Sequence, residues 1–214
     1  MIMCKGKQQI FMPTDIKDML YTLMGYPNEF SGLLIAERRK NGLIVFYGEL
    51  DEGTEDKGSP WRIPGRIEGL IASNSERYTL VPAHSHSRRF GEVIDIIDPY
   101  WSANKELAGD YERGTVVDNF FISRKQGGDS LVAEHFHKSG IDFHIFAHPA
   151  HGSEGQRMSR DKIRITAYKY NPSSIGRVRE VPLIYVPMLE MPLAKRGSEE
   201  LPDYEKSSNN LVAA

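Results

Sequence analysis

Residues 30–50, FSGLLIAERRKNGLIVFYGEL, decide the type of fold. Two runs rich in branched and aromatic side chains, 30–36 and 42–50, flank a short polar segment. Such runs are typical of β-strands, and the Asn41-Gly42 pair between them is typical of a tight turn. The stretch therefore predicts a β-hairpin of two antiparallel strands.

The residues before the hairpin predict an amphipathic helix. Apolar side chains recur there at spacings of three and four residues, at Ile16, Met19, Leu20, Leu23 and Met24. This spacing places them on one face of a helix. Thr14 is the expected cap and Gly25 the expected end.

More strands are predicted after the hairpin. Arg77 to Ala83 is expected to be a strand that ends at His84-Ser85-His86. The other predicted strands are Asn119 to Ser123, Ser130 to His137, Asp142 to His148, Ile163 to Tyr170 and Val181 to Val186. Lys138-Ser139-Gly140 predicts a hairpin turn between the second and third of these, and Asp95 to Gly109 predicts a helix.

The length of the chain favours a single domain. Its 214 residues compare with about 150 for a typical domain. We place this domain at residues 8–190 and expect residues 195–214, which are rich in Ser, Glu, Asn and Asp, to form a solvated tail. Hydrophobic residues at 40% and charged residues at 26% are ordinary for a globular protein.

Charge and cysteine content exclude several classes of protein. Lys and Arg number 27 against 29 Asp and Glu, so no global positive field favours nucleic acid or an anionic membrane. Cys4 is the one cysteine, which rules out an internal disulfide and fits a reducing compartment. No apolar run approaches the ~18 residues that span a bilayer. We therefore expect a soluble, cytoplasmic protein in which any metal is held by His, Asp or Glu.

The sequence His84-Ser85-His86 is the first candidate for chemistry. Residues i and i+2 of an extended backbone project to the same side and can bind one metal ion. Asp95 and Asp98 follow three residues apart, on one face of the predicted helix. Two histidines and one of these aspartates would give the three protein ligands typical of a zinc hydrolase. The simpler alternative is a pair of surface or core histidines.

Glu29 is the candidate general base. It precedes the apolar run at Phe30, where a carboxylate has no obvious packing role. A hydrolytic zinc site needs a carboxylate near the metal that accepts a proton from water. The alternative is a solvated loop residue.

Together these residues resemble the JAMM motif of the JAB/MPN metalloproteases. That motif consists of a Glu in ExxG before an apolar strand, then HxH, then SxxD. Here Glu29-Phe30-Ser31-Gly32 matches the first part and His84-Ser85-His86 the second. Asp95-Ile96-Ile97-Asp98 stands where SxxD is expected. The resemblance covers roughly Gln9 to Ser123.

The resemblance implies an α/β fold, a mixed β-sheet flanked by helices with the MPN/JAB, cytidine-deaminase-like architecture. It also implies that His84, His86 and Asp98 bind Zn²⁺ and that Glu29 activates water to cleave a peptide or isopeptide bond. The substrate would be a protein or peptide, and many members of the family remove ubiquitin-like modifiers. Asp95 departs from the motif, because it puts a carboxylate where a serine would help to stabilise the oxyanion. Two alternatives stay open: a non-catalytic MPN-like scaffold that binds a partner, and a metal hydrolase that acts on a small molecule.

A second group of histidines follows the motif. Its members lie within seventeen residues of one another: His135, His137, His144, His148 and His151. A pair across neighbouring strands, such as His137 with His144, could form a second metal or substrate site. The alternation with Phe136, Phe143 and Phe146 equally fits one face of a half-buried hairpin.

Overall fold

The structure, a computed structural model, describes residues 8–25, 29–52, 74–86, 100–104, 115–117, 120–123, 128–150 and 159–187. The helices in these ranges are α1 (Thr14–Leu23) and α4 (Asp129–Lys138), with a short 3-10 turn η1 (Arg160–Lys162). The strands are β1 (Gln9–Pro13), β2 (Phe30–Arg39), β3 (Gly42–Glu52), β4 (Tyr78–Ser85), β5 (Trp101–Asn104), β6 (Thr115–Val117), β7 (Phe120–Ser123), β8 (Phe143–Pro149), β9 (Ile163–Tyr170), β10 (Val178–Val181) and β11 (Leu183–Val186).

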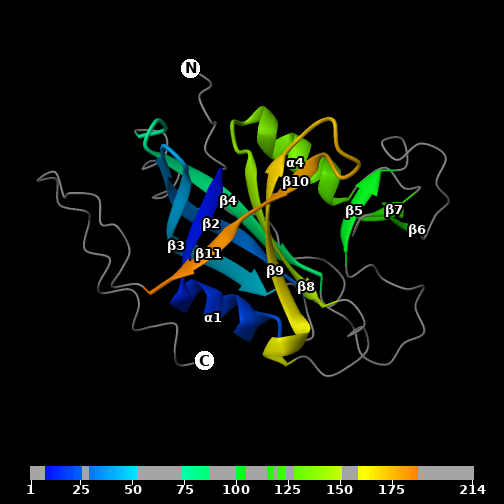
Figure 1. The fold of residues 1–214 in the computed structure, drawn as a ribbon, viewed down its shortest axis with the longest axis horizontal. Helices are drawn as coiled ribbons and strands as arrows, with labels where there is room; N and C mark the ends of the chain where they lie inside the picture. The colour runs from blue at the N-terminus through cyan, green and yellow to red at the C-terminus, as the bar shows by residue number, and fades with distance from the viewer. Residues whose placement is uncertain are drawn as a thin grey trace, which may run out of the picture.

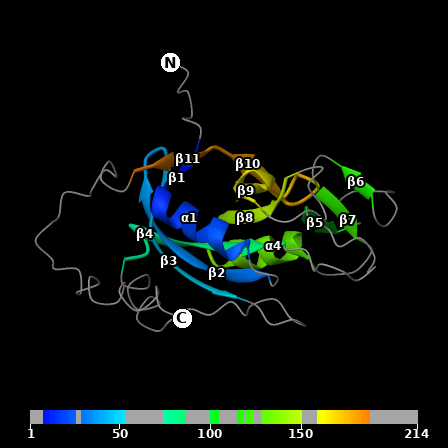
Figure 2. The ribbon, with the colours of Figure 1, turned by 90° about the horizontal axis from the view of Figure 1, so that it is seen from below.

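Eight strands form one mixed sheet that curves almost into a barrel (Figures 1 and 2). Their order is β10-β9-β8-β4-β2-β3-β1-β11, and β5-β7-β6 form a separate small sheet. β10 and β11 stand at opposite edges of this order, although only Pro182 separates them in the chain. β10 pairs with β9 and β11 pairs with β1. Because the continuous segment β10–β11 pairs with both edge strands, the sheet curves and nearly closes.

The main core fills the inner side of the curved sheet. Strand residues alternate between the two faces, and the inner positions Val81 and Ala83 of β4 and Ile145 and Ala147 of β8 are small or branched. α1 contributes Ile16 and Leu20 to the same core, so this helix lies against the inner face (Figure 2). Buried side chains of this core include Ile10, Met12, Phe30, Leu34, Val45, Val81, Ala83, Ile145, Ala147 and Ala167.

α4 and β5 cover part of the outer face. Ala133 of α4 and Trp101 of β5 pack with Phe146, Tyr168 and Val178 of the sheet. The loop between β9 and β10 holds both covering elements. Gly176 accepts a hydrogen bond from the Trp101 indole, 3.0 Å long, and Arg177 forms an ion pair with Glu134 of α4.

The expected fold class is wrong. The described residues form mostly sheet with only two helices, whereas an MPN/JAB-type fold, a mixed sheet flanked by helices, was expected. The difference has a physical cause, since the inner apolar face is covered largely by the sheet itself. β1 and β11 extend the sheet beyond β3 until the β10–β11 segment meets β9, which leaves room for one helix inside.

Several predicted elements are confirmed, among them the helix α1, the hairpin of β2 and β3, and the strands β4, β8 and β9. The strand expected at residues 130–137 is wrong, because these residues belong to α4. Ala133 and Phe136, three residues apart, both face the sheet, as helical spacing requires. The predicted hairpin turn at residues 138–140 instead ends this helix.

Two further elements differ from expectation. Trp101–Asn104 is a strand, although residues 95–109 were expected to be helical; apart from Tyr100, which is not helical, the rest of that range is outside the described residues. The strand expected at 181–186 is interrupted at Pro182, which has no backbone N–H to donate.

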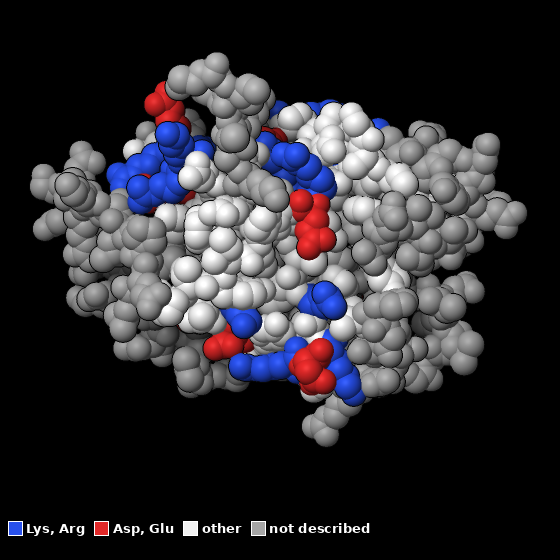
Figure 3. Space-filling view, viewed as in Figure 1, with Lys and Arg blue, Asp and Glu red and all other residues white. Residues whose placement is uncertain are grey.

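Charges of both signs are interspersed on the face seen in Figure 3, around a broad uncharged area. Several opposite charges on the protein are paired, including Arg39 and Arg77 with Glu37, and Arg160 with Asp18. Neither helix in the described ranges is long and apolar enough to cross a membrane.

Candidate metal centre

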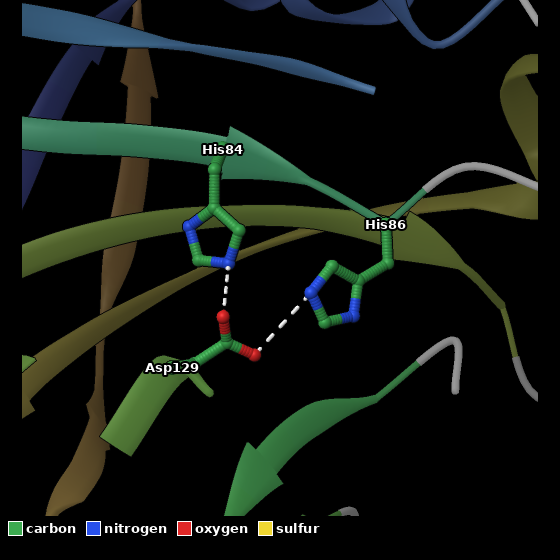
Figure 4. Close-up of side chains that lie close together, drawn as sticks. All are labelled: His84, His86 and Asp129. Carbon is green, nitrogen blue, oxygen red and sulfur yellow. Dashed lines mark ion pairs between the residues drawn. The ribbon is translucent and has the colours of Figure 1, made fainter. Parts of the chain in front are cut away.

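β4 delivers two histidines to the outer face of the sheet. The strand lies between β2 and β8, and its inner positions Val81 and Ala83 are in the core. His84 and His86 occupy alternate positions at its end, so both side chains point outward on the same side (Figure 4). The ring centroids are 5.4 Å apart, and both rings pack against Phe146. The predicted same-side projection of the two histidines is therefore present.

Asp129 brings a carboxylate to both imidazoles. It is the first residue of α4 and is buried. Its Oδ1 lies 3.0 Å from His84 Nε2 and its Oδ2 lies 3.3 Å from His86 Nε2 (Figure 4). One donor atom from each of the three residues lies within 4.8 Å of the others. The three form a compact cluster of nitrogen and oxygen ligand atoms.

Ser102 of β5 orients the Asp129 carboxylate. Its backbone N–H and its hydroxyl both donate to Asp129 Oδ2 over 2.8 Å. The Asp129 N–H in turn donates to Ser102 Oγ, also over 2.8 Å. Gly128 permits this close approach, because a Cβ there would lie 2.6 Å from Ser102 Oγ and its φ is +113°. Two hydrogen bonds from Ser102 thus hold the carboxylate, and a third joins the backbone of α4 to the Ser102 side chain of β5.

The electrostatics keep the carboxylate charged. Burial alone would raise the pKa of Asp129, but the charges and hydrogen bonds of His86 and His84 hold that pKa well below its usual range. Two neighbouring histidines are shifted towards the neutral form. Burial lowers the pKa of His144 to about 3 and that of His148 to about 4. The site therefore combines one anionic carboxylate with neighbouring imidazoles that remain neutral.

The donor set fits a metal ion. Two imidazoles and one ionised carboxylate are a ligand combination found in zinc hydrolases. A partner that orients the ligating carboxylate, as Ser102 does, is usual around such ions. His84, His86 and Asp129 could hold a metal ion, and their chemistry alone leaves its identity open among the metals that accept nitrogen and oxygen ligands.

Glu29 lies at the same end of the sheet. The N–H of Phe30, the next residue, donates to Ser85 Oγ over 2.9 Å, and Ser31 is paired with His84. Continuing this antiparallel register by two residues places Glu29 opposite His86. Phe30 faces the inner core, so alternation directs its neighbour Glu29 to the outer face that carries the histidines.

The other predicted site residues have different outcomes. Asp95 and Asp98 lie outside the described residues. Asp129 was not predicted as a ligand, because it follows His86 by more than forty residues and belongs to no local spacing pattern. The Gly-Gly-Asp sequence at 127–129, just before an apolar pattern, was the available signal of a helix start with a carboxylate in its first turn.

In the second histidine group, His137 and His144 do not form a cross-strand pair, because they lie on a helix and a strand. His137 lies on α4, where its Nδ1 is 2.7 Å from Asp142 and its ring stacks on Tyr170. His144 lies on β8 beneath that helix, fully buried between Trp101 and Phe136. His148 is also on β8, and its Nδ1 is hydrogen-bonded to the Pro149 carbonyl oxygen over 2.8 Å. His151 lies outside the described residues.

Comparisons with known proteins leave the family open. No protein-family description matches the chain, and no curated protein matches it. One similar solved structure is the solution structure of protein DSY2949 from Desulfitobacterium hafniense. Its sequence identity is 12% and its TM-score is 0.42, over 85% of this chain and 95% of that one.

Proposed function

We propose that this protein is a zinc-dependent hydrolase that cleaves a peptide or isopeptide bond. The observation that carries the proposal is the cluster of His84, His86 and Asp129, whose donor atoms lie within 4.8 Å of one another. Three protein ligands that leave a further coordination position open are the usual arrangement of catalytic zinc, whereas structural zinc is generally held by four. Zinc bound there would lower the pKa of a water molecule towards about 7 and polarise a carbonyl group.

The protein residues supply the remaining chemistry. Glu29, on the same face and opposite His86 in the continued register, is the proton acceptor for the attacking water. It then returns that proton to the amine that leaves. Asp129 stays ionised through its contacts with His84 and His86, and Ser102 holds its orientation. Glu29 thus transfers the proton, and Asp129 is a metal ligand that Ser102 orients.

The substrate in this proposal is a protein or peptide, and removal of a ubiquitin-like modifier is one form that the reaction could take. The resemblance of Glu29-Phe30-Ser31-Gly32 and His84-Ser85-His86 to the JAMM motif supports it. The competing proposal is a non-catalytic protein that keeps the metal and binds a partner. Glu29 separates the two, because a scaffold has no need of a proton acceptor beside the metal.

Metal analysis and a peptidase assay test the proposal together. Purified protein should contain about one zinc per chain, and its peptidase activity should be lost with a chelator and restored by zinc. Glu29→Gln should keep the zinc and lose turnover, because an amide cannot accept the proton. Glu37→Gln is the matched control, since Glu37 lies on β2, the strand that follows Glu29, but is paired with Arg39 and Arg77.

Three outcomes would count against this function. Absence of a transition metal from carefully purified protein would remove its basis. Full zinc content with Glu29→Gln as active as the unchanged protein would exclude Glu29 as the base. Full zinc content without hydrolysis of any peptide or isopeptide would favour the binding protein.

A further inference from the structure

Four side chains on neighbouring strands form a row across the outer face, and this row passes through the candidate metal centre. Ser85 pairs with Ala147 in the parallel register of β4 and β8, and the His86 N–H donates to the Ala147 carbonyl over 3.1 Å. The next position in this register places His86 beside His148. His148 in turn pairs directly with Arg164 on β9. Together with Glu29 opposite His86, these residues form the outer-face row Glu29, His86, His148 and Arg164.

The row is electrically polar. Glu29 gives one end a carboxylate and Arg164 gives the other end a guanidinium. Between them lies His148, which is buried. The permanent positive charge of the row is that of the Arg164 guanidinium, on the side of the metal ligands away from the proposed base.

Arg164 is available to a ligand. Its side chain is exposed, and within the described part of the chain no carboxylate lies within ion-pair distance of it. Other basic side chains of the protein are engaged: Arg160 with Asp18, Arg77 with Glu37, and Arg177 with Glu134. A guanidinium pairs with a carboxylate through two parallel hydrogen bonds, which gives direction as well as attraction.

From this arrangement we infer that Arg164 forms an anion subsite for a substrate carboxylate close to the bond that is cleaved. The inference rests on the proposed function, because it assumes that the scissile carbonyl lies at His84, His86 and Asp129. Two strand spacings, about 10 Å, separate His86 from Arg164 along the row. An extended peptide covers that distance in about three residues. The substrate class is thus a peptide or amide with a carboxylate within three residues of its scissile bond.

His148 lies in the row between Glu29 and Arg164, and its ring is held in place. Its ring stacks on Phe146 with centroids 4.9 Å apart, and its Nδ1–H donates to the Pro149 carbonyl. This fixes the ring and leaves Nε2 as the acceptor nitrogen. In the strand register, a peptide that runs from the metal ligands to Arg164 would cross His148, which lies between His86 and Arg164.

Binding of thiol probes to the zinc-loaded full chain tests the inference. A thiolate ligates zinc, so short, medium and long mercaptoalkanoates carry their carboxylate to different distances along the row. For one of these lengths the acid should bind about twofold to fivefold more tightly than its methyl ester, as expected for an exposed ion pair. Arg164→Ala should abolish this preference without changing zinc affinity, and Arg164→Lys should restore part of it. Arg179→Ala, an exposed arginine of β10, is the control.

The outcomes separate this inference from the proposed function. If zinc binds normally but acid and ester bind alike, or the preference survives in Arg164→Ala, the anion subsite is disproved and the metal centre stands. If the chain binds no zinc, the proposed function and this inference are overturned together. If Arg164→Ala alters zinc affinity itself, Arg164 supports the fold of the metal centre and the subsite is rejected.

Discussion

Strands β4 and β8 carry different chemistry on their two faces. The inner face presents Val81, Ala83 and Ile145 to an apolar core shared with α1. The outer face presents His84 and His86, with Phe146 packed between them and the aromatic rings of the covering layer. Successive residues of the same strands therefore alternate between the apolar core and the candidate metal centre.

This separation has a structural consequence. The inner core is continuous across most strands and needs no element of the outer layer. The outer cluster depends on α4 and β5, because Asp129 and Ser102 come from these elements. Substitutions on the inner face should thus change the free energy of unfolding, whereas substitutions on the outer face should change metal affinity.

The largest effect is expected on the inner face. Ile145→Ala should lower the free energy of unfolding by about 2–5 kcal/mol, because Ile145 is fully buried and its truncation leaves a cavity. Ile145→Val, which removes one methyl group, should lower it by about 0.5–1.5 kcal/mol. Denaturant unfolding of the metal-free protein measures both. Zinc stoichiometry of the folded variants should stay unchanged, and a loss of zinc in Ile145→Val would show that the two faces are coupled.

On the outer face, the largest effect is expected at the carboxylate. Asp129→Asn should lower zinc affinity by more than about 100-fold, which is the upper range for loss of a supporting partner, because a neutral amide replaces the anionic candidate ligand. Asp98→Asn is the informative comparison, since the motif resemblance predicts Asp98 as a ligand. Zinc titration of both variants decides between the two carboxylates. Unchanged affinity in Asp129→Asn with loss in Asp98→Asn would assign the site to Asp98.

A smaller effect on zinc affinity is expected from Ser102, which contacts the candidate ligand Asp129. Ser102→Ala removes the hydroxyl that donates to Asp129 Oδ2, but the Ser102 N–H still donates there. We expect zinc affinity to fall by about 10- to 100-fold. Ser130→Ala, at the neighbouring position of α4, is a suitable control in the same titration. An effect of Ser102→Ala as large as that of Asp129→Asn would mean that the hydroxyl is needed to form the site at all.

The two faces also differ in how far the sequence predicts them. The inner core follows from alternation and helical spacing, which is why α1, the β2–β3 hairpin and β4 were predicted correctly. The same alternation predicted the outer pair His84 and His86, but it could not predict their carboxylate. Asp129 meets them only because β5 and the β9–β10 loop hold α4 in place, and such contacts between distant segments leave no local pattern.

The fold class failed for a related reason. Closure of the sheet depends on the β10–β11 segment, which pairs with β9 on one side and β1 on the other. Each of these strands has an ordinary apolar pattern that does not specify its partner. The histidine-rich segment 130–137 alternates well enough to suggest a strand, yet its apolar side chains at 133 and 136 make contact with the sheet as a helix.

A further predicted effect depends on pH and concerns a buried histidine on the outer face. His144 is fully buried on the outer side of β8, and neither ring nitrogen has a hydrogen-bond partner among the described residues. Burial lowers its pKa from 6.5 to about 3. Between these pH values the unfolded chain binds a proton that the folded chain does not, so the free energy of unfolding falls as the pH falls. The contribution of His144 is about 1.4 kcal/mol per pH unit within that window.

His144→Phe should therefore reduce the acid sensitivity of the metal-free protein below about pH 6 and should leave it at least as stable at pH 7, because an apolar ring replaces unpaired polar atoms. Denaturant unfolding between pH 4 and 7 gives the slope, and His137→Phe on the exposed side of α4 is the control. Zinc affinity at pH 7 tells whether His144 also acts on the site, since the charge of His84 contributes to its pKa shift. An unchanged slope would show that His144 takes up a proton in the folded protein, and the packing between Trp101 and Phe136 would then have to admit water.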